Sequence, residues 1–427
     1  MIDLSQYKKI HCIGIGGIGL SAIAEILLSR GYEVSGSDMK ESAETVRLAS
    51  KGARVFIGHR AENVEQADLL VFSAAVGQDN PEMKRAEERG IPILSRAQML
   101  GLLMQEYENS IAVSGTHGKT TTTSMVSLIL ERAKLEPTIL VGGNLTEIGG
   151  NVKVGHSRYF ITEACEYTNS FLKFNPSLEI ILNIEEDHLD FFKDLADIRH
   201  SFKLFAERVP AQGAIVINGD IENYQEIIEA AKGKVITFGH SRGNDYSAGD
   251  IQYDDYAHPS FDLYIGGEKK ERLTLGVAGE HNVYNAMAAA AVGLQLGLTI
   301  AEIKSGIEKA ETIAGRTNFI KTHGMTVIDD CYNANPVSMR SSIEVLSHAK
   351  GRTIAVLGDM GELGSDEKKL HHEVGEAVGE NHIHTLFATG ELAKEYAAGA
   401  AEKSSDVDIH YFEDRETMTQ ELLSYVK

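Results

Sequence analysis

The stretch from Val113 to Thr121, with the sequence VSGTHGKTT, constrains the fold more than any other part of the chain. It follows a short apolar run at 111–113 and precedes apolar residues at helical spacing over 125–130. This order predicts a strand, a glycine-rich loop and a helix, an arrangement that binds phosphate through backbone N–H groups and the helix N-terminus. Val113 stands where the general phosphate-loop pattern has its first glycine, so the nearest glycine is Gly115.

The side chains of this loop predict a site for ATP and Mg²⁺. Lys119 can reach the terminal phosphates, and the Thr120 hydroxyl can ligate Mg²⁺. Two further strands are predicted at 159–162 and 179–184; Glu163 ends the first, and His188 follows the second. Because the carboxyl ends of parallel strands meet at one edge of a sheet, Thr120, Glu163 and His188 form a predicted metal set. The alternative is a plain glycine turn with a solvated lysine, a solvated glutamate and an incidental histidine.

A second glycine-rich loop, Gly14 to Gly19, lies near the N-terminus. It sits between a predicted strand at 9–15 and a helical pattern at 20–28, and Asp38 ends the next strand, 19 residues beyond Gly19. This is the fingerprint of a nucleotide-binding Rossmann-like unit, with an acidic residue placed for ribose hydroxyls. Alone it would suggest NAD.

Composition limits the partners of the chain. The 427 residues are too many for one core, and the formal net charge of −21 opposes nucleic-acid binding. There is no apolar run of transmembrane length and no signal-peptide pattern, so we expect a cytoplasmic protein without a membrane partner. Three distant cysteines indicate free thiols.

Strand and helix patterns alternate along the chain and predict an α/β protein of three domains. The predicted domains are a Rossmann-like unit at 1–107, a central phosphate-loop unit with a mainly parallel sheet at 108–313, and a second Rossmann-like unit at 314–427. The polar tail from Ala401 is uninformative about structure, and His371 with His372 is interpreted as the solvated face of a helix.

Several motifs together resemble those of the Mur ligases, the ATP-dependent amide-forming enzymes of peptidoglycan precursor synthesis, over nearly the whole chain. These motifs are GIGGIGLS at 14–21, SGSD at 35–38, NPE at 80–82, GTHGKTT at 115–121, SFL at 170–172, DHLD at 187–190, HN at 281–282 and NA at 285–286. The resemblance implies that the first domain binds a UDP-sugar rather than NAD, that the central domain binds ATP and Mg²⁺, and that the third closes over both.

The resemblance also implies roles for individual residues. The implied catalytic residues are Lys119, Glu163, His188 and Arg316. ATP would contact Gly115, Thr116, His117, Gly118, Lys119, Thr120 and Thr121, with Asn282 at the adenine, Arg316 at the phosphates after closure and Asp330 at the ribose. The UDP pocket would be formed by Gly16, Gly17, Ser37, Asp38 and Ser73.

Within the family, the first two domains resemble members that join L-alanine to the lactyl carboxylate of UDP-N-acetylmuramate through an acyl phosphate. The third domain instead resembles that of the D-alanyl-D-alanine-adding members, with DDCYNANP at 329–336 and VLGDMGELG at 356–364. Cys165 and Glu166 stand where the alanine-adding members usually have an Asp-Glu pair. A different amine, such as glycine, serine or a dipeptide, therefore stays open.

Two readings from other classes also stay open. A nicotinamide-dependent dehydrogenase would use the first glycine loop but leaves Lys119 unexplained. A non-catalytic UDP-sugar sensor would not need Lys119, Glu163 and His188, which are all present. The expected assembly is a monomer or a homodimer.

Overall fold

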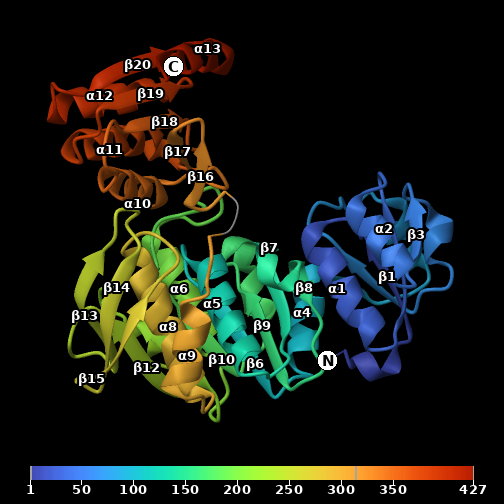
Figure 1. Cartoon of the computed structure of the whole chain (residues 1–427). Helices are drawn as coiled ribbons and strands as arrows, with labels where there is room; N and C mark the ends of the chain where they lie inside the picture. Colours follow the sequence, from blue (N-terminus) through green and yellow to red (C-terminus); the bar gives the residue numbers. More distant parts are fainter. Residues whose placement is uncertain (1, 313–314, 427) are drawn as a thin grey trace.

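Four β-sheets divide the chain into three α/β domains (Figure 1). The computed structural model describes residues 2–312 and 315–426. The N-terminal domain lies beside the central domain, and the third domain lies above the central one in the view of Figure 1. The predicted three-domain α/β fold with mainly parallel sheets is confirmed. The domain boundaries stay predictions, and the one placed at 313/314 lies outside the described residues.

The N-terminal domain is a five-stranded parallel sheet with the order β3-β2-β1-β4-β5. The chain reverses its direction of winding between β1 and β4, which are neighbours in the sheet, and the first glycine loop follows β1 at this point, where sheets of this kind bind ligands. Its elements are η1 (Leu4–Gln6), β1 (Lys9–Ile13), α1 (Ile18–Ser29), β2 (Glu33–Asp38), α2 (Ala43–Ser50), β3 (Arg54–Ile57), η2 (Ala61–Val64), β4 (Leu69–Phe72), α3 (Pro81–Glu88), β5 (Ile93–Ser95) and α4 (Arg96–Met104).

The central domain is built on a ten-stranded sheet with the order β15-β14-β13-β12-β11-β10-β6-β9-β7-β8. Strands β10 and β11 are buried along their whole length, as expected of parallel strands covered on both faces. The elements are β6 (Asn109–Ser114), α5 (Lys119–Arg132), β7 (Thr138–Leu145), η3 (Thr146–Ile148), β8 (Gly150–Lys153), β9 (Tyr159–Glu163), η4 (Tyr167–Lys173), β10 (Leu178–Ile181), α6 (Leu195–Ala206), β11 (Ala214–Asn218), α7 (Gln225–Ile228), β12 (Lys234–Gly239), β13 (Tyr246–Tyr253), β14 (Pro259–Ile265), β15 (Glu268–Thr274), α8 (His281–Gln295) and α9 (Ile300–Ile307).

The third domain combines a hairpin, β16-β17, with a three-stranded parallel sheet, β18-β19-β20. Its elements are β16 (Asn318–Thr322), β17 (Met325–Asp329), α10 (Pro336–Ser347), β18 (Ile354–Gly358), η5 (Gly364–Asp366), α11 (Glu367–Glu380), β19 (Thr385–Thr389), α12 (Lys394–Lys403), β20 (Asp408–Phe412) and α13 (Arg415–Tyr425).

The structure adds two elements to this domain and corrects one interpretation. The polar tail from Ala401, which was uninformative as sequence, contains β20 and α13, whose pattern is weak because α13 has a single buried residue, Met418. His371 is fully buried rather than solvated, and its ring nitrogens pair with the Met360 N–H and the Glu367 carbonyl.

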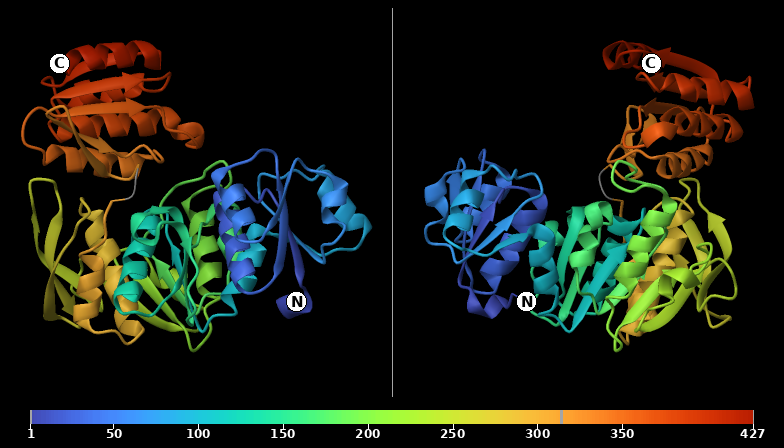
Figure 2. Two further views of the ribbon diagram at one scale, coloured as in Figure 1. Left: turned by 45° about the vertical axis from the view of Figure 1, so that its right-hand side comes forward. Right: turned by 180° about the vertical axis from the view of Figure 1, so that it is seen from behind.

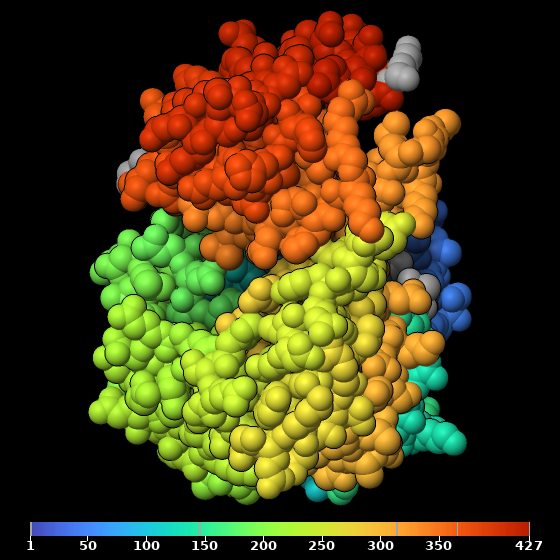
Figure 3. All heavy atoms as spheres, turned by 60° about the vertical axis from the view of Figure 1, so that its left-hand side comes forward, coloured from blue at the N-terminus to red at the C-terminus, as the bar shows by residue number. Residues whose placement is uncertain are grey.

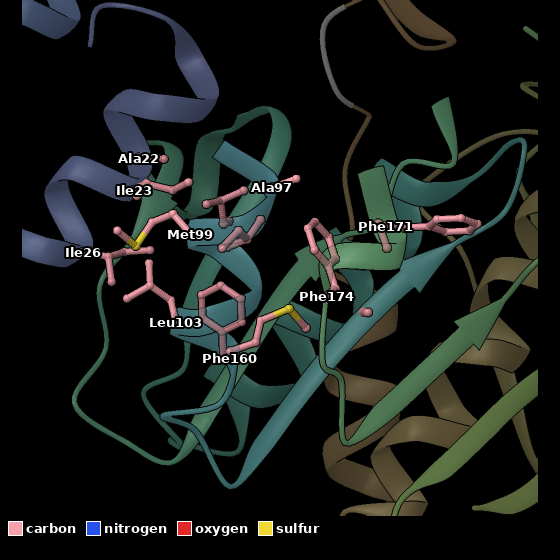
Figure 4. Packing of buried hydrophobic residues seen from close by; sticks show 14 of the residues in the cluster. Ala22, Ile23, Ile26, Ala97, Met99, Leu103, Phe160, Phe171 and Phe174 are labelled. Atoms are coloured by element: carbon pink, nitrogen blue, oxygen red, sulfur yellow. The ribbon is translucent and has the colours of Figure 1, made fainter. Parts of the chain in front are cut away.

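The N-terminal and central domains share one apolar core (Figure 4). Ile23 and Ile26 of α1 face Met99 and Leu103 of α4, and the same cluster continues to Phe160 of β9. The two surfaces also approach very closely, because a Cβ atom at Gly101 of α4 would lie 1.9 Å from the Lys173 carbonyl oxygen. The joint between the first two domains is therefore packed like a domain interior.

The third domain rests on the central domain through a smaller contact (Figures 2 and 3). A cluster of Ala257, Ala278 and Val345, with Phe319 and Ile328 packed against it, provides the apolar part. Among the described residues, no helix has the length and apolarity needed to cross a membrane.

Candidate active site

The glycines of the central loop have backbone conformations that other residues rarely adopt. Gly115 has φ +136°, and Gly118, which precedes the first residue of α5, has φ +81°. A Cβ atom at Gly115 would lie 2.9 Å from Cβ of Leu182, and one at Gly118 would lie 2.5 Å from Oδ1 of Asn285. Both positions therefore require glycine for conformation and for space.

Side chains beyond β10 hold this loop in place. Asn183 Oδ1 accepts the His117 N–H at 2.7 Å, and its Nδ2 donates to the His117 carbonyl at 3.2 Å. The Thr116 hydroxyl oxygen accepts the Glu185 N–H at 2.9 Å. The Thr116 hydroxyl thus anchors the loop, and the contact of this residue with ATP stays a prediction.

Lys119 is held by the loop and by a buried carboxylate. Its Nζ donates to the carbonyls of Gly115 and Thr116, at 2.6 and 3.1 Å, and to the Glu166 oxygens at 3.0 and 3.2 Å. Burial by itself disfavours the ammonium form, but the negative charge of Glu166, with smaller effects from Cys165 and Glu163, outweighs it and raises the pKa of Lys119. The lysine therefore stays cationic in a largely enclosed position.

A cleft of about 1090 Å³ lies between the central and third domains. Every site residue predicted in the central and third domains lines this cleft, except Gly115, which precedes the first lining residue. The predicted residues that line it are Thr116, His117, Gly118, Lys119, Thr120, Thr121, Glu163, His188, Asn282, Arg316 and Asp330. The structure therefore brings together Thr120, Glu163 and His188, which the sequence placed at one edge of a sheet, with residues of the third domain up to 330.

Two oxygen donors for a divalent cation lie next to the loop. Thr120 follows Lys119 at the start of α5, and Glu163 ends β9 with its Oε1 accepting the Gly142 N–H at 2.6 Å. This bond leaves the other carboxylate oxygen of Glu163 for a ligand. A hydroxyl and a carboxylate are donors that suit Mg²⁺.

The third predicted metal residue, His188, has a neighbour in the third domain that the sequence did not indicate. Its Nδ1 lies 2.9 Å from Oε2 of Glu362 in the third domain and 4.0 Å from Oδ1 of Asp187. These three side chains offer ligand atoms within 4.8 Å of one another. Tyr167 stacks on the His188 ring, with ring centroids 4.5 Å apart.

Asn335 makes a second polar link between the domains. Its Nδ2 lies 3.3 Å from both Nδ1 of His117 and Oδ2 of Asp187. Asn335 belongs to the DDCYNANP motif, whose position after a predicted strand was the one available signal for its role.

Arg316 faces the cleft from the start of the third domain. Its guanidinium carbon lies 4.1 Å above the ring of Tyr332, and its buried Nε has no hydrogen-bond partner within the described chain. A buried, unpaired donor on a cation fits an anionic ligand such as a phosphate group.

Asp330 and Asn282 are engaged by neighbouring groups. Asp330 accepts the Thr317 N–H at 2.8 Å through Oδ1 and the Ser342 hydroxyl through Oδ2, so it fixes the segment that carries Arg316. Asn282 is almost fully buried; its Nδ2 donates to the Ala278 carbonyl at 2.7 Å and its Oδ1 accepts from Asn285 at 2.8 Å. The ribose and adenine contacts of these two residues stay predictions.

The N-terminal glycine loop lies outside this cleft. Its Gly16 N–H donates to Asp38 Oδ2 at 2.9 Å, and Ser73 packs against Gly14, where an added Cβ would lie 3.1 Å from Cβ of Ser73. Gly17 is exposed next to them. The structure therefore assembles most of the predicted UDP-binding residues at one place.

Ser37 is the exception in that set. Its side chain is fully buried, and its hydroxyl donates to Glu82 Oε2 at 2.6 Å and lies 2.9 Å from Nδ1 of His59. The substrate contact predicted for Ser37 therefore does not extend to its hydroxyl, which is used inside the domain.

Family models match all three domains and define the class of protein. Residues 9–108 match "Mur ligase family, catalytic domain", residues 113–293 match "Mur ligase middle domain", and residues 315–427 match "Mur ligase, glutamate ligase domain". The chain belongs to the Mur ligase family of ATP-dependent amide-forming enzymes. The resemblance predicted from the motifs is confirmed.

Individual proteins of the family are similar to this chain over most of its length. The chain is 50% identical to the UDP-N-acetylmuramate--L-alanine ligase of Lachnospira eligens over 93% of its own length and 85% of the relative. Its structure is similar to that of the UDP-N-acetylmuramate-alanine ligase MurC of Thermotoga maritima, with a TM-score of 0.73, 26% identity, and 95% and 90% of the two chains covered. MurF of Acinetobacter baumannii is also similar, with a TM-score of 0.69, 26% identity, and coverage of 93% and 86%.

Proposed function

We propose that this chain joins L-alanine to the lactyl carboxylate of UDP-N-acetylmuramate, with ATP as the energy source, in peptidoglycan precursor synthesis. The observation that carries the proposal is the cleft that gathers the Lys119 loop, Glu163 and Arg316 between two domains. The name and coverage of the Lachnospira eligens relative support L-alanine as the amine.

Amide formation from a carboxylate needs a better leaving group than oxide. A carboxylate oxygen of the muramate attacks the γ-phosphorus of ATP, which forms an acyl phosphate and releases ADP. The amine nitrogen then attacks the acyl carbon, inorganic phosphate leaves, and the nitrogen loses a proton. Because the steps depend on positioning and charge, no nucleophile from the protein is required.

The residues of the cleft would divide these tasks. Backbone N–H groups at Gly118 and Thr121 would bind phosphate oxygens at the N-terminus of α5, and the ammonium of Lys119 would stabilise the transferred phosphoryl group. Arg316 would approach the same phosphates from the third domain, where its unpaired Nε lies.

We also propose that Mg²⁺ is required. Thr120 and Glu163 would hold one ion, and His188 would hold a second. When bound, Mg²⁺ neutralises phosphate charge and orients the phosphoryl group for in-line transfer.

The UDP part of the acceptor would bind at the N-terminal glycine loop, with Gly16, Gly17 and Ser73 near the diphosphate and Asp38 near the uridine ribose. We further propose that the protein is cytoplasmic, because its proposed nucleotide substrates are cytoplasmic. We also propose that it is a monomer or a homodimer.

A second candidate is a Mur ligase that adds another amine, such as glycine, serine or a dipeptide. The DDCYNANP and VLGDMGELG motifs of the third domain favour it, as does the likeness to MurF. A non-catalytic UDP-sugar sensor is disfavoured because Lys119, Glu163 and Arg316 all line one cleft.

The test is phosphate release from Mg-ATP with UDP-N-acetylmuramate and one amine at a time: L-alanine, glycine, L-serine or D-alanyl-D-alanine. Turnover with L-alanine is expected. Turnover with another amine alone would move the assignment to the second candidate, and no turnover with any of the four would contradict the proposed acceptor.

A further inference from the structure

The contact between His188 and Glu362 joins two domains at the edge of the cleft. His188 lies in the loop after β10 of the central domain, and Glu362 lies in the loop after β18 of the third domain, 174 residues further along. Oε2 of Glu362 is 2.9 Å from Nδ1 of His188. Because His188 lines the cleft, this bond is a direct contact between the third domain and a cleft residue.

The neighbours of the ring decide where its proton lies. Both groups near Nδ1 are carboxylates, Glu362 at 2.9 Å and Asp187 at 4.0 Å, and an ionised carboxylate can only accept a hydrogen bond. A neutral His188 therefore carries its proton on Nδ1. Its Nε2 is left with a lone pair and makes no hydrogen bond or ion pair within residues 2–312 and 315–426. This is the pattern of a metal-binding histidine whose other nitrogen donates to a carboxylate.

The surroundings keep the ring in this orientation. The Tyr167 ring stacks on it at 4.5 Å with 30° between the planes, and the Tyr167 hydroxyl donates to Asp190 at 2.8 Å. His188 has φ +52° and Glu362 has φ +61°, so two non-glycine residues are in the left-handed region at the point of contact. Such conformations are unfavourable for residues other than glycine and persist where the surrounding structure maintains them.

We propose that Glu362 is a positioning residue that the third domain supplies to the central cleft: it accepts the Nδ1 proton of His188 and leaves the Nε2 lone pair available to a divalent cation. The inference rests on the proposed function, in which His188 holds the second Mg²⁺. It extends that function, because the cation site is then complete only when the third domain is docked on the central one.

Variants at position 362 of the full chain can separate the carboxylate from the backbone. Glu362→Gly removes the acceptor and also relieves the left-handed conformation, whereas Glu362→Ala removes the acceptor and keeps the strain. Glu362→Gln retains an acceptor oxygen without the charge. Glu391→Ala, at an exposed acidic residue of the same domain, is the matched control.

Two measurements report on the site without turnover. Nitrogen-15 NMR of labelled histidine, at a pH where His188 is neutral, gives its tautomer. Electron paramagnetic resonance with Mn²⁺ as the probe, in the presence of ADP, gives the affinity of each bound ion. We expect Glu362→Gly and Glu362→Ala to mix the two tautomers and to weaken one Mn²⁺ site about 10–100-fold. Glu362→Gln should keep most of the wild-type tautomer, and Glu391→Ala should match wild type.

His188→Ala separates failure of this inference from failure of the proposed function. If His188→Ala weakens Mn²⁺ binding and the position-362 variants do not, the role of Glu362 is wrong and the cation role of His188 stands. If His188→Ala leaves both Mn²⁺ affinities unchanged, the inference is wrong too, while ATP-dependent ligation is still judged separately by phosphate release. If Glu362→Gly kept the wild-type tautomer and Mn²⁺ affinity while Glu362→Ala lost them, only the strain of the loop would matter. That result would also overturn the proposal.

Discussion

The two glycine-rich loops of this chain share a backbone plan and differ in the side chains around them. Each follows a buried parallel strand, β1 or β6, and leads into a helix, α1 or α5. In the N-terminal loop the Gly16 N–H is bonded to the carboxylate of Asp38, whereas in the central loop Lys119 stands against Glu166. In the proposed function, a strand, loop and helix would provide a position for phosphate in both domains, and the adjoining side chains would determine whether the ligand is only held or also reacts.

Removal of the Lys119 ammonium group should have the largest effect on turnover. We expect Lys119→Ala to lower turnover by about 10³-fold or more, because the ammonium acts on charge that develops during phosphoryl transfer. The dissociation constant of UDP-N-acetylmuramate, measured by calorimetry, should not change, since that ligand would bind at the other loop. Lys193→Ala, at an exposed lysine of the same domain, is the control. Full activity in Lys119→Ala would remove the distinction between the two loops.

A matching change beside the first loop, at the end of β2, should affect binding rather than turnover. Asp38→Ala removes an acceptor of the Gly16 N–H and the predicted partner of the ribose. A hydrogen bond to a charged group contributes about 1.5–3 kcal/mol, so the dissociation constant of UDP-N-acetylmuramate should rise about 10–100-fold. Turnover at saturating substrate should stay within a few-fold of wild type. An unchanged dissociation constant would contradict the role of Asp38.

The pairing of Lys119 with Glu166 predicts a dependence of stability on pH. Because the folded-state pKa of Lys119 is raised above its ordinary value, the pair stabilises the fold fully below the unfolded pKa of about 10.4, and this contribution is lost as pH rises through the folded pKa. Glu166→Gln should lower the free energy of unfolding by about 1.5 kcal/mol at pH 8. Urea titrations of both proteins should show this difference shrinking above pH 10.4; a constant difference up to pH 11.5 would count against the ion pair.

The smallest effect is expected at the ring beneath Arg316. Tyr332→Ala removes the surface on which the guanidinium stacks, a contact of about 0.5–1 kcal/mol at an exposed ring. The KM for ATP should rise by about 2–5-fold, while Tyr332→Phe, which keeps the ring, should stay near wild type. Equal KM values in all three proteins would show that Arg316 is positioned without the ring.

The sequence predicted the parts of the site that depend on local order. The phosphate loop, its helix and the strand end at Glu163 are encoded within short stretches of glycines, apolar runs and polar ends, so their positions could be inferred. Glu166 and Glu362 could not be found in this way, because they meet their partners across 47 and 174 residues of chain. Such pairings depend on how the domains pack, and periodicity carries no information about that.

What the sequence missed in the third domain has a physical cause of the same kind. Strand β20 and helix α13 lie at one side of their sheet and bury little, so their polar residues resemble a tail. His371 is polar, yet its two ring nitrogens find backbone partners, which makes its burial possible. Composition alone does not reveal either situation.

The apolar core that α1 and α4 share with β9 bears on how the molecule unfolds. Since Gly101 of α4 lies directly against the Lys173 carbonyl, the N-terminal domain cannot separate from the central one without exposing buried side chains of both. On heating, these two domains should lose their structure as one cooperative unit, and the third, with its smaller contact, should melt on its own. Three folded bodies would then give two calorimetric transitions.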